Sequence, residues 1–130
     1  MGRSPKETIL EWVKAFNQRD AKAAAALYHE DAVDHQVAAG EPVRGRQAIL
    51  KNAEDFFREF PDSYTHVENM LESGQWIGLE WSGGGTSRST GKSFQLRGCG
   101  FFHIIDGKIK FQRGYWDKHT WFSQVGFTIS

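Results

Sequence analysis

Residues 94–117, FQLRGCGFFHIIDGKIKFQRGYWD, are the stretch of sequence that decides the fold. Asp106-Gly107 lies near its middle, and Asp-Gly between two apolar runs is a strong signal for a two-residue β-hairpin turn. The runs on either side are rich in aromatic and β-branched residues, which favours two long antiparallel strands over residues 94–105 and 108–117. Two glycines inside the first run predict that the sheet is bent.

Two further strands are predicted before this hairpin. Residues 64–71 and 75–81 form one run each, and Gly74 marks the turn between them. Residues 82–91 are rich in Gly, Ser and Thr, which predicts a flexible hairpin connection. The run over residues 83–87 also has a composition that can cradle a phosphate, but no helix follows it to supply a dipole. We therefore expect a four-stranded antiparallel meander in the second half of the chain.

The first third of the chain is predicted to be helical. One helix begins at Pro5, since proline is favoured in the first helical turn. A second helix runs over residues 21–28 after Asp20, which can cap it. Gly45 opens a third helix with a regularly spaced apolar side, and Pro61 ends it.

Two shorter elements complete the prediction. Val33, His35 and Val37 alternate with polar residues, which is typical of a strand, and residues 118–125 form a short helix. Helices first and consecutive antiparallel strands afterwards predict the α+β class, with helices covering one face of the sheet. The length fits one domain, residues 1–130.

The composition excludes several classes of function. Lys+Arg and Asp+Glu both number 16, so no basic surface for nucleic acid or membrane is expected, and the zero net charge favours self-association into a homodimer. Cys99 is the single cysteine, which excludes an internal disulfide or a cysteine-pair zinc site. His29, Glu30 and Asp31 are adjacent, as in a solvated helix end, so no metal is predicted. No apolar signal core or membrane-length run is present, which predicts a cytoplasmic protein.

Asp117 is the first candidate for chemistry. It shares the parity of Ile109, Phe111 and Tyr115, whose apolar side chains predict that this is the inward face of the strand. Burial would raise the pKa of its carboxyl group toward neutrality, which suits a general acid or base. The alternative is that Asp117 caps the helix over residues 118–125.

Two histidines are further candidates. His35 alternates with apolar residues and is predicted to point inward. His103 pairs with Lys110 if the hairpin has strict register, which puts it on the face opposite Asp117. A bulge or a longer turn would shift the register by one residue and remove this conflict. The alternative for each histidine is a structural role.

Four stretches carry a resemblance to a known family. They are residues 28–35, residues 43–49 leading to 60–62, residues 81–91, and residues 106–109 leading to 115–117 and followed by 124–126. In this order they resemble the SnoaL-like polyketide cyclase family, within the nuclear-transport-factor-like or ketosteroid-isomerase-like superfamily. The resemblance implies a cystatin-like α+β cone, in which a curved antiparallel sheet wraps around N-terminal helices and encloses an apolar pocket.

The resemblance also implies an activity. Cyclases of the family close a ring by intramolecular aldol condensation without metal or cofactor. Their acid/base aspartate matches Asp117, a histidine one strand earlier matches His103, and a polar group after the second helix matches Asp34 or His35. It further implies a homodimer formed through the outer face of the sheet, for which the candidates here are Phe94, Phe102 and Trp116.

We therefore expect an enzyme that acts on a hydrophobic carbonyl compound. Its substrate-binding residues are predicted to be Trp12, Asp34, Trp81, Phe101 and Tyr115. A ketosteroid-type isomerase is a close alternative, and epoxide hydrolysis would require a second carboxylate, for which Asp34 is the candidate. The alternative from another class is a non-catalytic module that binds a small molecule or dimerises.

Overall fold

The structure is a computed structural model that describes residues 2–126. Within this range the chain forms a mixed arrangement of helices and strands. In chain order they are α1 (Pro5–Asn17), α2 (Ala21–Ala25), β1 (Tyr28–Gln36), the short 3₁₀ helix η1 (Val37–Ala39), β2 (Val43–Arg44), α3 (Arg46–Glu59), β3 (Tyr64–Ser73), β4 (Trp76–Thr86), β5 (Ser93–Ile105), β6 (Lys108–Trp116) and α4 (Lys118–Val125).

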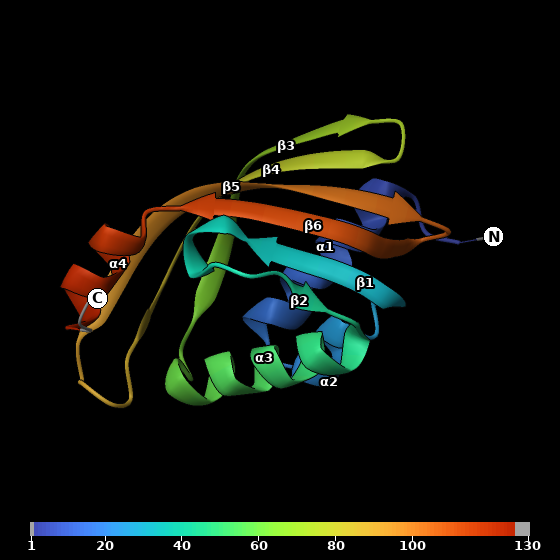
Figure 1. Cartoon of the computed structure of the whole chain (residues 1–130). Helices are drawn as coiled ribbons and strands as arrows, with labels where there is room; N and C mark the ends of the chain where they lie inside the picture. Colours follow the sequence, from blue (N-terminus) through green and yellow to red (C-terminus); the bar gives the residue numbers. More distant parts are fainter. Residues whose placement is uncertain (1, 127–130) are drawn as a thin grey trace.

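The strands form one curved sheet in the order β2-β1-β6-β5-β4-β3. Strands β3 to β6 make the predicted antiparallel meander, while β1 joins β6 in a parallel pairing. Helices α1, α2 and α3 lie on the concave side, and α4 follows β6 at one end (Figure 1). The predicted α+β fold, with a curved sheet around N-terminal helices, is therefore confirmed. Among residues 2–126, none of the helices has the length and apolar composition of a transmembrane span.

Local signals set most of the boundaries. Ser4 caps α1 through a reciprocal capping box with Glu7, and Asp20 caps α2. Gly107 has a φ of +74°, as the predicted two-residue turn requires, and Ile105 pairs with Lys108 across it. The second helix ends at Ala25 rather than at residue 28, because the chain already enters β1 there.

The prediction of a flexible hairpin connection over residues 82–91 was wrong for its first half: strand β4 continues to Thr86, its glycines at 83–85 are buried, and the connection to β5 begins only at residue 87. A Cβ atom at Gly83 would lie 2.6 Å from the Tyr64 carbonyl oxygen, and one at Gly84 would lie 2.6 Å from that of Phe94. These glycines therefore permit close approach of neighbouring strands, and their composition reflects tight packing rather than mobility.

A bulge between β5 and β6 decides which residues face the inside of the fold. Next to the turn, Ile104 of β5 pairs with Ile109 of β6. One residue further from the turn, His103 pairs with Phe111, so β6 contains one extra residue at this point. Beyond this point Gln112 and Gly114 are buried, and Phe111 and its neighbours of the same parity face outward. Because a shift of one residue exchanges the two faces of a strand, the prediction that Phe111, Tyr115 and Asp117 face inward was wrong.

Candidate functional site

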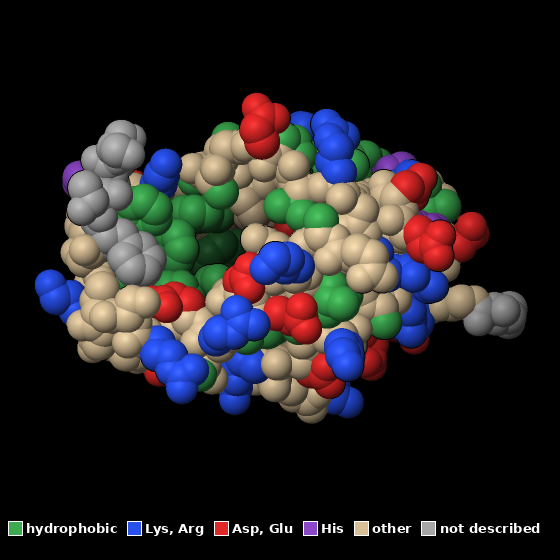
Figure 2. Space-filling model, turned by 60° about the horizontal axis from the view of Figure 1, so that its bottom comes forward, with side chains coloured by type: hydrophobic (Ala, Val, Ile, Leu, Met, Phe, Trp, Pro, Cys, Tyr) green, Lys and Arg blue, Asp and Glu red, His purple; other side chains and the backbone are tan. Residues whose placement is uncertain are grey.

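A cavity of about 520 Å³ lies between the concave face of the sheet and the helices. It opens on the face shown in Figure 2, where hydrophobic side chains line the hollow. Rings from α1, α3, the sheet and α4 form its apolar walls: Trp12, Phe16, Phe56, Phe57, Phe60, Trp81, Phe94, Phe102, Trp116 and Trp121. Such a space suits a flat hydrophobic molecule.

Asp34 is the buried carboxylate of this cavity. It lies on β1 beside Gln112 of β6, and it is 9% exposed. Its Oδ1 atom accepts a hydrogen bond of 2.8 Å from Gln36 Nε2, and its Oδ2 atom has no hydrogen-bond partner among the described residues. Burial raises the pKa of Asp34 from its ordinary 3.8 to about 6, although the hydrogen bond from Gln36 opposes the rise. The group is therefore poised to exchange a proton near neutral pH.

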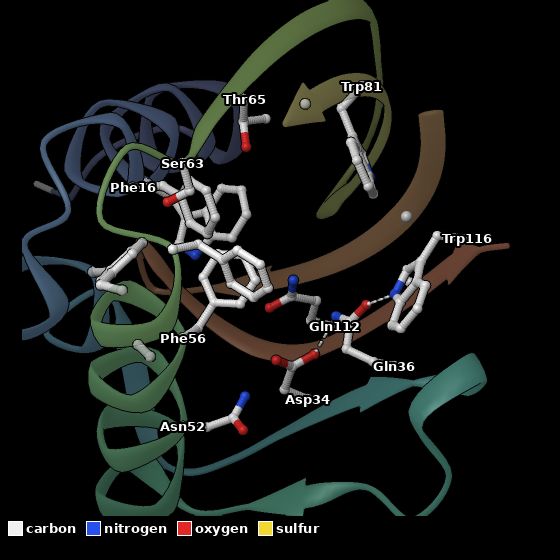
Figure 3. A pocket seen from close by; sticks show the side chains of 18 of the residues that line it. Phe16, Asp34, Gln36, Asn52, Phe56, Ser63, Thr65, Trp81, Gln112 and Trp116 are labelled. Carbon is white, nitrogen blue, oxygen red and sulfur yellow. Dashed lines mark hydrogen bonds between the residues drawn. The ribbon is translucent and has the colours of Figure 1, made fainter. Parts of the chain in front are cut away.

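Gln36 connects Asp34 with the wall of the cavity. Asp34 and Gln36 are two residues apart on β1 and share its inner face, as Figure 3 shows. The Oε1 atom of Gln36 accepts a 3.0 Å hydrogen bond from Trp116 Nε1. A Cβ atom at Gly114 would lie 2.3 Å from that same Oε1 atom. Because Gly114 has no side chain, the Gln36 side chain can reach Trp116 across β6. Its amide is held at both atoms, since Nε2 donates to Asp34 and Oε1 accepts from Trp116.

Gln112 is the second fixed amide. Its Oε1 atom accepts a hydrogen bond from the Tyr28 hydroxyl, which in turn accepts one of 3.0 Å from Trp12 Nε1. Burial raises the pKa of Tyr28 well above its ordinary value, with the nearby Asp34 charge adding to the rise, so the phenol keeps its proton. The Gln112 Nε2 atom has no protein partner in the described part of the chain and points into the cavity (Figure 3). It can donate to an oxygen placed beside Asp34.

Two other carboxylates lie along the cavity, both on α3. Asp55 is bound by Lys51 and Arg58, and Glu59 is bound by the hydroxyl groups of residues 87 and 89. Hydrogen bonds to the charged form lower the pKa of both groups. They therefore stay ionised and engaged, which distinguishes them from Asp34.

Asp117 does not lie in the cavity, so its predicted burial was wrong. It is exposed and caps α4, accepting hydrogen bonds from the backbone N–H (3.1 Å) and the hydroxyl group (2.9 Å) of Thr120. These bonds lower the pKa of Asp117 rather than raise it. The prediction that Asp117 faces inward assumed that β6 alternates without interruption from Ile109, which the bulge prevents. The alternative prediction, that Asp117 caps the following helix, is confirmed.

Both histidines lie on the outer face of the sheet, against the prediction of a place beside the substrate. The His103 ring stacks on Trp76 with ring centroids 4.5 Å apart. His35 lies beside Arg113, whose Nε atom is 3.3 Å from His35 Nδ1. On β1, Asp34 and Gln36 face inward together with the buried Ala32, whereas Val33 and His35 lie on the opposite face.

The predicted substrate-binding residues divide between the two faces. Trp12, Asp34 and Trp81 line the cavity. Phe101 and Tyr115 lie outside it, 49% and 43% exposed. The bulge in β6 turns Tyr115 outward, whereas Phe101 lies on the outer face of β5, whose alternation is unbroken. Conversely, Phe94, Phe102 and Trp116 line the cavity, so their predicted place on the outer face was wrong.

Sequence reasoning missed Tyr28, Gln36 and Gln112. One signal was present: Asp34 and Gln36 are polar and share one parity of their strand. The apolar residues of each strand pointed to the opposite parity as the inner face, whereas a polar pair such as Asp34 and Gln36 is also what a polar cavity wall requires. Among the described residues no group of three or more His, Cys, Asp or Glu is arranged to hold a metal ion.

Known proteins match the chain in fold and in family. Residues 9–112 match the model of the SnoaL-like domain family. No curated protein matches the sequence significantly. IdmH, a proposed polyketide cyclase from Streptomyces antibioticus, has a similar structure with a TM-score of 0.81 and 26% identity, over 95% of this chain and 99% of that one.

Two more distant structures share the fold. One is a protein with a ketosteroid isomerase-like fold from Catenulispora acidiphila, with a TM-score of 0.86 and 17% identity, over 97% of this chain and 96% of that one. The other is an LEH-like epoxide hydrolase from Mycobacterium tuberculosis, with a TM-score of 0.80 and 17% identity, over 93% and 88% of the two chains. Because the family match covers most of the sequence, the chain belongs to the family of SnoaL-like domains.

Proposed function

We propose that the chain is an enzyme in which Asp34 moves a proton at a carbon beside the carbonyl group of a hydrophobic compound. One observation carries the proposal: a buried carboxylate with a pKa of about 6 lies in the wall of a cavity lined largely by aromatic rings. The similarity to a proposed polyketide cyclase of 26% identity supports it. No cofactor is required by this chemistry.

The neighbouring amide supplies the second half of the reaction. Asp34 Oδ2 takes the proton from the carbon, and the electron pair moves onto the carbonyl oxygen, where Gln112 Nε2 donates a hydrogen bond to the developing enolate. In an aldol cyclisation the enolate carbon then forms a bond with a second carbonyl carbon, and Asp34 returns its proton to the new alkoxide. In an isomerisation the proton returns to a different carbon. Both outcomes leave Asp34 as it began.

Deuterium exchange tests the proposal without knowledge of the natural substrate. The protein is incubated in D₂O with flat ketones, beginning with β-tetralone, and NMR follows the replacement of hydrogen beside the carbonyl group. We expect the catalysed rate to rise with pH and to level off above about pH 6, since the ionised Asp34 is the base. If the ketones quench the fluorescence of the cavity tryptophans but none exchanges faster than in buffer, the chain is a binding module instead.

The proposed partner is a second copy of this chain, bound at the outer face of the sheet. Phe101, Tyr115 and Trp76 are 49%, 43% and 43% exposed there, and exposed apolar surface of this kind is typical of an interface. We expect sedimentation velocity to show a dimer, and Phe101→Glu to weaken it at least tenfold. Leu10→Glu, at a residue of equal exposure on α1, is the matched control. A wild-type monomer at about 100 μM contradicts the dimer.

The remaining parts of the proposal follow from the sequence. The chain acts as one domain of residues 1–130, and its place of action is the cytoplasm. A tag fused to either end should report a diffuse distribution in cells.

A further inference from the structure

We propose that the ligand carries a second oxygen atom, in a hydroxyl or carbonyl group, at the end remote from Asp34, where Ser63 and Thr65 bind it. The inference rests on the proposed function in so far as the cavity holds the substrate. It adds a class of substrate: a flat hydrophobic body with an oxygen-bearing group at each end.

Ser63 is the first observation. It is 1% exposed and lines the cavity, and its Oγ atom has no hydrogen-bond partner among the described residues. Its backbone is held on both sides, because its N–H donates to the Phe60 carbonyl and its own carbonyl accepts from Arg19. A buried hydroxyl group without a partner destabilises the folded protein, so a fixed hydroxyl of this kind points to an absent partner.

Thr65 is the second observation. Its backbone N–H and carbonyl are both bound by the Asn17 side chain, at 2.7 and 2.9 Å. Its hydroxyl group has no partner in the described part of the chain, and Figure 3 shows that it points into the cavity. The residue opposite on β4 is Gly83, which has no side chain to cover this hydroxyl. The backbone of Thr65 is thus rigid while its hydroxyl remains available.

The position of this pair relative to Asp34 completes the argument. Ser63 and Thr65 lie at one end of the space in Figure 3, and Asp34 and Gln112 lie at the other. Phe56 and the remaining aromatic wall lie between the two ends. The cavity therefore has two polar ends and an apolar middle, and a ligand that fills it matches this pattern when it carries an oxygen atom at both ends.

Matched ligands test the inference. The probes are β-tetralone with and without a hydroxyl group on its far ring, and testosterone with and without its hydroxyl group. Quenching of tryptophan fluorescence gives the Kd of each. We expect the hydroxylated member of at least one pair to bind about five- to tenfold more tightly to the wild type, as one hydrogen bond provides. Thr65→Val and Ser63→Ala should each reduce this preference to less than twofold.

Ser73→Ala is the control variant. It removes an exposed hydroxyl group from β3, the strand of Thr65, outside the cavity, and should leave the preference for the hydroxylated ligand unchanged. Neither Ser63→Ala nor Thr65→Val should lower Tm, because neither hydroxyl has a partner within residues 2–126. A lower Tm, an equal affinity within both pairs, or a preference that persists in Thr65→Val overturns the inference. If the protein catalyses deuterium exchange but does not prefer the hydroxylated ligands, only this inference is contradicted. If it prefers the hydroxylated ligands but catalyses no deuterium exchange, only the proposed function is contradicted.

Discussion

Asp34→Asn is expected to lower the rate of deuterium exchange by about 10²–10⁴-fold, the usual contribution of a general base. Asparagine has nearly the same shape, and its Oδ1 atom can still accept the hydrogen bond from Gln36 Nε2. The Kd of β-tetralone should therefore change little, because the aromatic wall that binds it is untouched. The amide nitrogen cannot take a proton from carbon, so only the chemical step is lost. NMR gives the exchange rate and fluorescence gives the Kd.

Two other aspartates provide controls for this result. Asp55 also lines the cavity but is held by Lys51 and Arg58, so Asp55→Asn should change the rate by less than threefold. Asp117→Asn should likewise leave exchange unchanged, since asparagine caps helices nearly as well as aspartate. If Asp117→Asn abolishes exchange and Asp34→Asn does not, the sequence-based choice of base is right and the cavity-based one is wrong.

The sequence predicts the fold well because its boundaries are local. Pro5 begins α1, Asp20 caps α2 through a residue three positions away, and Asp106-Gly107 forms a turn between residues three positions apart, each in its predicted role. The prediction of an α+β fold with a curved sheet rests on such signals and on the order of elements. Family resemblance and local chemistry agree at this level.

The site was harder to predict, because it depends on which face of each strand is inside. In β6 that face is decided by the bulge opposite His103 and Ile104, a long-range feature with no sequence signature of its own. Apolar content does not reveal the inner face either, since Phe101 and Tyr115 on the outside are as apolar as the residues within. A shift of one residue moved Asp117 to the surface and left Gln112 beside Asp34.

The pH dependence of stability tests the burial of Asp34 independently of any substrate. Its pKa is about 6 in the folded protein and close to the ordinary 3.8 when the chain unfolds. Below about pH 3.8 the group is protonated in both states and has no effect on stability. As the pH rises, the unfolded chain loses its proton first and is favoured, until the folded protein also ionises above about pH 6. Ionisation of Asp34 therefore destabilises the folded protein near neutral pH.

Asp34→Asn is accordingly expected to raise the free energy of unfolding by about 3 kcal/mol at pH 8, the equivalent of the difference between the two pKa values. The gain should fall as the pH is lowered through the window from about 6 to 3.8 and should vanish at its lower end. Urea unfolding of both proteins at several pH values measures it, and the difference between them cancels all other titrating groups. A gain that is the same at every pH would reflect repacking around the new amide. If Asp34→Asn is less stable than the wild type at pH 8, water or a hydrogen-bond donor already stabilises the charge of Asp34. The pKa of Asp34 would then lie close to that of a surface carboxylate, and the group would have no advantage as a base.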